Sequence, residues 1–495
     1  MIDRRAAIAG LLSLSACAAV ADAPPRAPLP RTRPLGPIPE ATSEAGFELK
    51  ARLGPSGPSG WLVADLDTGA VLDAQDGERA FAPASVAKMP TALYAAERLG
   101  LAHRFETAVL GRGRLAAGTL DGDLILKGGG DPELDSDALY TLAEALRSAG
   151  LTRITGRFLV DGAPLPEIAS IDPTQPIDVP YNPGVAGLNL NFNRVRLRWG
   201  RGQPRFSALG EGRDPAAPWI GVDPARGRPM HVVAGERVLW RLPARALQGR
   251  GERWLPVKRP VLHAGRVFQA IAREVGIVLP SPELGLAGEA RVLARLSGRP
   301  LGEVASDMLR FSTNLTAEAL GLAASHATDG APATLAASAG LMNRWHAGCI
   351  GRSSDDAAIG FVNHSGLSIQ SRIAPEHLVA LLASAAGRGA AKARAPSLPP
   401  GTAAALLAPY ALGGRDNPLA AATEVRAKTG TMDYVRGLSG YLTTPGGRRL
   451  AFAILSNDLA ARRGAVRQLN RAWMRRAKGF ERALLLSWAG RFDRA

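Results

Sequence analysis

Three short groups of residues in the chain could together carry out nucleophilic catalysis, and the first is Ser85-Val-Ala-Lys88. A serine at a helix N-terminus has its hydroxyl at the positive end of the helix dipole, and a lysine one turn further on can share a hydrogen bond with it. If burial and a second cation disfavour the ammonium form, the lysine amine can take the serine proton. The spacing therefore predicts a serine nucleophile with a lysine base. The alternative is a surface lysine that follows an N-terminal serine by chance.

The other two groups lie far along the chain and are Phe311-Ser312-Thr313-Asn314 and Ala427-Lys428-Thr429-Gly430-Thr431. Each has an ordinary structural explanation, since serine and asparagine cap helices and Lys-Thr-Gly suits a strand that ends in a turn. Together, however, the order Ser-x-x-Lys, Ser-x-Asn, Lys-Thr-Gly resembles the signature of penicillin-binding proteins and class A β-lactamases. The joint occurrence of the three groups favours the catalytic interpretation.

Lysine is rare in this chain, which makes its positions informative. Only seven of the 60 basic residues are lysines, and Lys88 and Lys428 both fall within these groups. Lysine can lose its proton near neutral pH, whereas arginine stays charged and is planar and wider. The patterns Gly-x-Ser-x-Gly, His-Glu-x-x-His and Cys-x-x-Cys are absent from the sequence, which removes the simplest α/β-hydrolase and zinc interpretations. We therefore expect neither a metal nor a cofactor.

The long separation of Ser85 from Ser312 exceeds what a simple β-lactamase needs between these groups, so a domain must be inserted. This arrangement resembles the D-alanyl-D-alanine carboxypeptidase/endopeptidase family of serine peptidases, the penicillin-binding protein 4 type. The resemblance extends over about residues 45–465. It includes four further stretches: Gly122-Asp-Leu-Ile-Leu-Lys-Gly-Gly-Gly-Asp-Pro132, Leu188-Asn-Leu-Asn-Phe-Asn193, Ser312-Thr-Asn-Leu-Thr-Ala-Glu318 and Ser365-Gly-Leu-Ser368.

The resemblance implies an α/β (α+β) fold, with a β-lactamase/transpeptidase-like domain in which helices flank an antiparallel sheet. We expect this domain to comprise residues 46–107 and 258–495. Short β-type segments broken by glycine and proline predict an inserted, strand-rich domain at 108–257. A signal peptide at 1–23 and a proline-rich tether at 24–45 would precede both.

The resemblance also implies a role for each residue of the three groups. Ser85 would attack a carbonyl between two D-amino acids, and Lys88 would accept its proton. Ser312 would relay the proton to the leaving amine, and Asn314 would bind the peptide amide. Thr429, Gly430 and Thr431 would form the substrate-binding strand. Lys428 and Thr429 would bind the substrate carboxylate, and the backbone N–H of Thr431 would stabilise the oxyanion. Peptidoglycan peptides would be the substrates and β-lactams the inhibitors.

Two departures from the family pattern affect the neighbourhood of the predicted site. Asn363-His364 stand where this family often has Asp-Gly before Ser-Gly-Leu. Pro90 follows the Ser-Lys pair, and a proline there removes one helical hydrogen bond and favours a kink.

The N-terminus predicts export. Arg4-Arg5 precede an apolar stretch from Ala6 to Ala16 that is too short to span a bilayer. Leu14-Ser-Ala-Cys17 resembles a bacterial lipobox, in which Cys17 would carry a lipid; the alternative is that Cys17 is an ordinary residue of a cleaved leader. We therefore expect a periplasmic protein that contacts the membrane only through this lipid. Cys349 would have no disulfide partner.

The formal charge is +16 and the calculated pI is about 10.7. The arginines are scattered and no basic run is interleaved with aromatics, so we do not expect nucleic-acid binding. The basic C-terminal segment, with Arg471, Arg475, Arg476, Lys478 and Arg482, suits either a solvated helix or a contact with anionic lipid or a partner. The oligomeric state is not predicted.

Two other functions are compatible with the same pattern. The first is a β-lactamase-like hydrolase or esterase on the same fold, which would turn penicillin over quickly. The second is a non-catalytic cell-wall-binding lipoprotein that has kept the fold, in which Lys88 would be dispensable.

Overall fold

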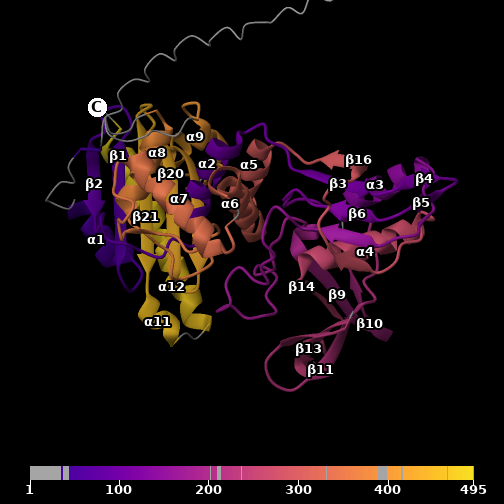
Figure 1. Cartoon of the computed structure of the whole chain (residues 1–495). Helices are drawn as coiled ribbons and strands as arrows, with labels where there is room; N and C mark the ends of the chain where they lie inside the picture. The colour runs from indigo at the N-terminus through magenta and orange to yellow at the C-terminus, as the bar shows by residue number, and fades with distance from the viewer. Residues whose placement is uncertain are drawn as a thin grey trace, which may run out of the picture.

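A computed structural model describes residues 35–36 and 44–493, except 201, 209–212, 236, 331, 388–397, 414–415 and 465–466. The predicted leader, the lipobox at Cys17 and almost all of the tether lie outside the described residues. Figure 1 shows two bodies side by side, one built around a long sheet and the other richer in short strands. None of the described helices is long and apolar enough to cross a membrane.

The first body is built on a five-stranded antiparallel sheet with strand order β19-β20-β21-β1-β2. Its strands are β1 (Ser59–Asp65), β2 (Val71–Gln75), β19 (Glu424–Met432), β20 (Val435–Thr443) and β21 (Arg449–Asn457). Every residue of β1 is buried, which is typical of a strand covered on both faces. Strands from the first and last parts of the chain therefore meet in one sheet.

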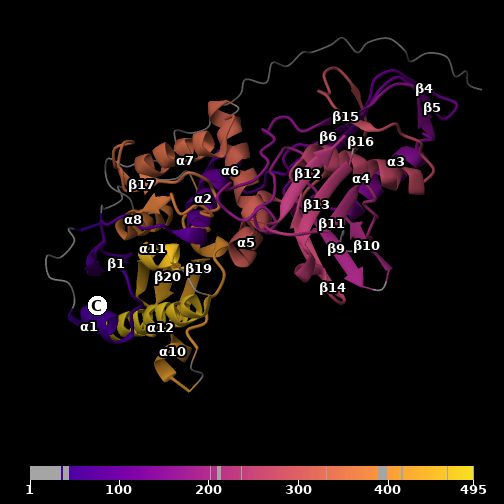
Figure 2. The same ribbon diagram turned by 90° about the horizontal axis from the view of Figure 1, so that it is seen from below.

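Helices cover both faces of this sheet, so that the body has three layers (Figure 2). On one face Leu62 and Ala64 of β1 pack in a large core with α2 (Lys88–Leu99), α5 (Leu301–Phe311), α6 (Asn314–Asp329), α7 (Leu335–Ile350) and α8 (Pro375–Ala385). On the other face Trp61 and Val63 pack against Phe480 and Leu484. Alternate side chains of one strand thus enter two cores, because successive residues point to opposite faces.

The helical layer on this second face of the sheet contains the basic C-terminal helix, α12 (Arg467–Arg491), which packs beside α1 (Glu44–Leu53). One face of α12 buries Trp473, Phe480, Leu484 and Trp488 against the sheet. The five basic residues singled out in the sequence are exposed on its other face. The helix is therefore solvated on one side only, and its apolar side is part of the core.

The second body is strand-rich, as predicted, and its described residues form four sheets. The largest has the order β15-β8-β6-β3-β16, and two three-stranded sheets have the orders β10-β9-β14 and β11-β13-β12. Two helices, α3 (Ser136–Ser148) and α4 (Pro260–Glu274), pack in its core. The strands are β3 (Glu106–Gly111), β4 (Arg114–Ala116), β5 (Thr119–Asp121), β6 (Leu124–Lys127), β7 (Arg153–Ile154), β8 (Phe158–Asp161), β9 (Arg194–Gly200), β10 (Gly202–Ser207), β11 (Ile220–Ala225), β12 (Met230–Ala234), β13 (Arg237–Pro243), β14 (Gly251–Pro256), β15 (Pro282–Leu284) and β16 (Arg291–Ser297).

Pairing and packing within this body continue past residue 257, the expected end of the inserted domain. Strand β15 pairs with β8, and β16 pairs with β3 along its whole length. Helix α4, which follows residue 257, contributes Val261, Val267 and Phe268 to the same core. We propose that the chain returns to the first body near Gly298.

The loop that carries Asn363-His364 is held from several sides. Asn363 Oδ1 accepts a hydrogen bond from the N–H of Gly366 at 3.0 Å, as a turn-forming side chain does. The ring of His364 is fully buried, lies against Gly321 of α6, and has its Nε2 2.8 Å from Ser338 Oγ. A Cβ on Gly321 would lie 2.2 Å from that ring. A histidine at position 364 therefore requires glycine, which has no Cβ, at position 321.

We predict that Gly321→Ala destabilises the protein by about 2 kcal/mol because the new methyl group would overlap the His364 imidazole. The double variant Gly321→Ala, His364→Gly should lose clearly less free energy of unfolding than the sum of the two single variants. Urea unfolding measures all three. Gly340→Ala in α7 is the matched control, since nothing lies within 4 Å of its added Cβ. Strict additivity would contradict the contact.

Candidate functional site

Ser85 and Lys88 lie where a short 3₁₀ helix, η1 (Ala84–Ala87), continues into α2. The expected helix, with Pro83 just before it, is therefore present, and both side chains are on one face. Pro90 falls in the first turn of α2, where backbone N–H groups have no partner within the α-helix, so it does not interrupt the helix. The short 3₁₀ segment takes the place of the expected kink.

The Lys88 side chain is fully buried and ends among three oxygen atoms. Its Nζ lies 2.9 Å from Ser85 Oγ, 2.7 Å from Asn314 Oδ1 and 2.8 Å from the carbonyl oxygen of Ser365. A neutral amine has two N–H donors and one lone pair, whereas a hydroxyl both donates and accepts. The site can therefore hold a neutral Lys88 that donates to Asn314 and Ser365 while its lone pair faces the Ser85 hydroxyl.

The surroundings of Lys88 favour this neutral form. Burial holds the pKa of Lys88 well below its ordinary value, and the positive charge of Lys428 lowers it further. Glu318 acts in the opposite direction, but its own carboxyl is fully buried and accepts N–H bonds from His364 and Ser365, each at 2.9 Å. A lysine base was expected to need a dry site near a second cation, and the surroundings of Lys88 provide both.

Lys428 and Ser312 form a second contact beside the first. Lys428 Nζ donates to Ser312 Oγ at 3.1 Å and to the carbonyl oxygen of Thr429 at 2.8 Å. Ser312 is in the left-handed conformation, with φ 59°, at the end of α5, so it turns the chain directly into α6, which begins at Asn314. Burial, and then the charge of Arg436, lower the pKa of Lys428 to about 8.

Strand β19 passes directly beside the backbone of Ser85. A Cβ on Gly430 would lie 2.5 Å from the carbonyl oxygen of Pro83 and 3.1 Å from the N atom of Ser85. Only a glycine allows so close an approach. The predicted residues Ser85, Lys88, Ser312, Asn314, Lys428, Thr429 and Gly430 are thus brought together from η1, α2, α5, α6 and β19, and Thr431 follows on the same strand.

Thr431 is held by a buried ion pair that the sequence did not reveal. Arg436 Nη1 donates to Thr431 Oγ1 at 2.8 Å, and the other side of its guanidinium donates to both carboxylate oxygens of Glu481 at 2.9–3.0 Å. Arg436 faces Thr431 across the β19–β20 pair, and Glu481 belongs to α12. The only signal in the sequence was an acidic residue within a strongly basic helix.

The second body also reaches the site. Asn314 Nδ2 donates to the carbonyl oxygen of Tyr181 at 2.9 Å, and the Tyr181 side chain is 47 % exposed. The neighbouring Asn182 accepts a hydrogen bond through its carbonyl oxygen from Lys258 at 2.9 Å. No pattern in the sequence distinguished Tyr181, whereas Glu318 and Ser365 lay within the family-like stretches without an assigned role.

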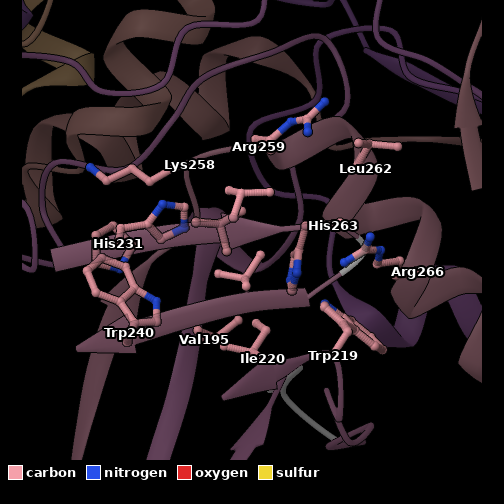
Figure 3. Close-up of a pocket in the computed structure, with 15 residues that line it drawn as sticks. Val195, Trp219, Ile220, His231, Trp240, Lys258, Arg259, Leu262, His263 and Arg266 are labelled. Atoms are coloured by element: carbon pink, nitrogen blue, oxygen red, sulfur yellow. The ribbon is translucent and has the colours of Figure 1, made fainter. Parts of the chain in front are cut away.

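A separate pocket lies in the second body and contains none of the predicted site residues (Figure 3). Trp219, Trp240, His231 and Lys258 are among its lining residues. His263 points into it from α4, and burial lowers the pKa of this imidazole to about 3. Among the described residues, no cluster of His, Cys, Asp and Glu side chains could hold a metal ion.

Comparisons with known proteins identify the family. The model of the D-Ala-D-Ala carboxypeptidase 3 (S13) family matches residues 54–476. A D-alanyl-D-alanine carboxypeptidase of Actinomadura sp. (strain R39) is 28% identical over 437 residues, which are 81% of this chain and 77% of the relative. The carboxypeptidase DacB of Haemophilus influenzae is 31% identical over 114 residues, 23% of this chain and 24% of the relative.

Solved structures support the same fold. Penicillin-binding protein 4 of Haemophilus influenzae superposes with a TM-score of 0.67 at 20% sequence identity, over 89% of this chain and 99% of that one. The same protein complexed with a novel β-lactam gives a TM-score of 0.65 at 21% identity, over 89% and 98%. The predicted α/β fold, with helices flanking an antiparallel sheet and a further strand-rich body, is confirmed. The chain belongs to the D-Ala-D-Ala carboxypeptidase 3 (S13) family of peptidases.

Proposed function

We propose that the protein is a serine-type D-Ala-D-Ala carboxypeptidase/endopeptidase that acts on peptidoglycan stem peptides through an acyl-enzyme. The observation that carries the proposal is the fully buried Lys88 amine, which lies 2.9 Å from Ser85 Oγ and whose pKa is held well below its ordinary value by burial and by the charge of Lys428. A buried lysine with this neighbour is a base placed at a nucleophile, which a cell-wall-binding protein would not need.

In acylation, Ser85 Oγ attacks the carbonyl carbon between the two D-alanines while its proton passes to Lys88 Nζ. The carbonyl electron pair moves to oxygen, and the backbone N–H groups of Ser85 and Thr431 stabilise the negative charge. Collapse of this intermediate breaks the C–N bond. The proton then reaches the leaving amine through Ser312 Oγ, which lies in hydrogen-bond contact with Lys428.

Hydrolysis completes the cycle with the same groups. A water attacks the acyl carbonyl and gives a proton to Lys88. The C–O bond to Ser85 then breaks, and Lys88 returns the proton to Ser85 Oγ. The ammonium of Lys428, with Thr429, binds the terminal carboxylate of the substrate, and Asn314 binds the peptide amide. Gly430 keeps β19 close enough for these contacts. β-Lactams would acylate Ser85 in the same way and leave slowly.

We further propose that the protein is exported to the periplasm, where its substrate lies. The leader and the lipobox at Cys17 support export, and a lipid on Cys17 would be the only membrane contact. The alternatives remain a β-lactamase-like hydrolase or esterase and a non-catalytic cell-wall-binding lipoprotein. Fast turnover of penicillin would favour the first, and an unchanged function of Lys88→Ala the second.

We predict that Ser85→Ala lowers the release of D-alanine from a peptide ending in D-Ala-D-Ala by more than about a thousand-fold, because no acyl-enzyme can form. Lys88→Arg should be similarly inactive, since arginine keeps its proton. An assay of free D-alanine measures both, with Lys478→Arg on the exposed face of α12 as the control. Undiminished activity of Ser85→Ala would contradict the proposed function.

We predict that acylation by a penicillin slows as the pH rises above about 8, because Lys428, whose pKa is lowered to about 8, then loses the charge that attracts the β-lactam carboxylate. Stopped-flow measurement of acylation over pH 6–10 tests this. The methyl ester of the same penicillin is the control and should not show the alkaline fall through this group. The same fall for acid and ester would contradict the role of Lys428.

We predict that Glu481→Gln lowers the free energy of unfolding by about 3 kcal/mol, because it leaves the Arg436 guanidinium buried without its carboxylate. The acylation rate should fall as well, because Arg436 also holds Thr431. Thermal unfolding and penicillin acylation measure the two effects. Lys478→Gln, an exposed change on the same helix, should alter neither. Full stability of Glu481→Gln would show that the pair does not support the site.

A further inference from the structure

The pocket of Figure 3 lies within the second body, where one side of α4 faces the sheet β11-β13-β12. Leu262, His263 and Arg266 of α4 line one wall, and His231 and Trp240 of the sheet line another. Spacings of three and four residues bring the side chains of α4 to one face of the helix. The peptidase mechanism uses none of these residues, so the pocket needs a separate explanation.

His263 carries a buried hydrogen-bonding atom that lacks a partner. The residue is 5 % exposed, and none of the described residues bonds to its Nε2. Burial, and then the charge of Arg266, lower the pKa of the imidazole to about 3, so the ring is neutral. A buried polar atom without a partner costs free energy and is rare in proteins. Because the side chain points into the pocket, a molecule bound there can supply the partner.

The other buried histidines of the described chain differ from His263 in this respect. His364 Nε2 lies 2.8 Å from a serine hydroxyl, and His346 Nε2 lies 3.1 Å from a backbone carbonyl oxygen. His377 Nε2 lies 3.0 Å from a glutamate carboxylate oxygen. Each of these rings therefore has at least one polar neighbour within the protein, whereas the imidazole of His263 faces the pocket.

Aromatic and aliphatic side chains make most of the pocket surface apolar. His231 and Trp240 face each other across the β12–β13 pair, and their rings meet edge to face with centroids 4.9 Å apart. Trp219 meets His263 in the same way at 6.0 Å. Such pairs hold the rings in defined orientations. The aliphatic lining residues include Val195, Ile220, Val238 and Leu262. A bound molecule therefore needs an apolar body to fill this space.

The charge around the pocket is positive. Lys258, Arg259 and Arg266 line it, and no aspartate or glutamate is among the described residues that do so. Lys258 donates to a backbone carbonyl oxygen, and Asp178, the acidic residue that acts on its pKa, already accepts a hydrogen bond from Arg253 at 2.7 Å. Positive charge without a carboxylate attracts an anionic group and repels an ammonium group.

These properties narrow the chemistry of the bound molecule. The cations disfavour a metal ion, and an inorganic anion would leave the apolar walls without contacts. A free amino acid would place its ammonium group among cations with no carboxylate to bind it. A carboxylate on an apolar body satisfies both requirements, because its oxygen accepts a hydrogen bond from an imidazole N–H.

We propose that this pocket binds a small carboxylate that has a planar apolar body and no amino group. The carboxylate accepts a hydrogen bond from His263 Nε2 and lies beside the guanidinium of Arg266. The apolar body packs against Trp240 and Leu262. The ligand is distinct from the peptide substrate, and its site is separate from that of Ser85.

The first test uses 4-fluorobenzoate and its neutral isostere 4-fluorobenzamide, observed by fluorine NMR with the purified protein. The acid should bind saturably, and the amide should bind at least about ten-fold more weakly because it lacks the charge. Prior acylation of Ser85 by penicillin should leave the affinity for the acid unchanged, since the adduct fills only the Ser85 site. Absence of saturable binding, equal binding of acid and amide, or loss of binding after acylation would each overturn the proposal.

The second test uses variants of α4. His263→Phe keeps a planar ring but removes the hydrogen-bonding nitrogen, and it should weaken binding of the acid by at least about ten-fold. Arg266→Met should weaken binding of the acid and leave that of the amide unchanged, whereas Arg273→Met, an exposed change on the same helix, should alter neither. Penicillin acylation at the wild-type rate reports that each variant is folded. Wild-type affinity in His263→Phe, or equal losses in the two arginine variants, would overturn the site.

Discussion

The burial of the Lys88 amine is the constraint on which the site depends. An amine in water keeps its proton and cannot act as a base at neutral pH, so a lysine base requires a dry position and a nearby positive charge. Both are supplied by long-range packing: α2 packs against the helices α5, α6 and α7, and β19 brings Lys428 to the same place. The N–H groups of the 364–365 loop hold Glu318 at the base of the site.

Each element around Lys88 has a position that tolerates little change. Gly430 lets β19 approach the backbone of Pro83 and Ser85, and Gly366 faces the carbonyl oxygen of Ala84, where a Cβ would lie 1.9 Å away. Arg436 and Glu481 tie the end of β19 to α12, which is otherwise a basic surface helix. The second body adds the carbonyl oxygen of Tyr181, which accepts a hydrogen bond from Asn314. The site is therefore built from both bodies.

The features of the fold and the site that could be predicted from the sequence were those encoded by residues close together in the chain. The three motifs are short, so Ser85, Lys88, Ser312, Asn314 and Lys428 could be named before any contact was known, and the spacing between them predicted an insertion. Nothing in the sequence indicated that β15 and β16 pair with strands more than a hundred residues earlier, because no local pattern reveals such pairing. Arg436 and Glu481 were missed for the same reason, since an arginine among so many arginines is distinguished only by what surrounds it, and its carboxylate partner lies in a distant helix. The loop at Asn363-His364 departed from the family pattern, yet the glycine that accommodates it, Gly321, lies in a different helix.

The most direct test of the account is the pKa of Lys88 itself. With only seven lysines in the chain, a protein labelled with ¹³C and ¹⁵N in its lysine side chains should give a resolvable set of Cε and Nζ signals, and the signal missing from Lys88→Arg identifies Lys88. Titration by NMR should show Lys88 losing its proton well below the ordinary value of a lysine, while exposed Lys478 titrates normally. A Lys88 that stays protonated as long as Lys478 does would contradict the lysine-base mechanism, whatever the variants do to activity.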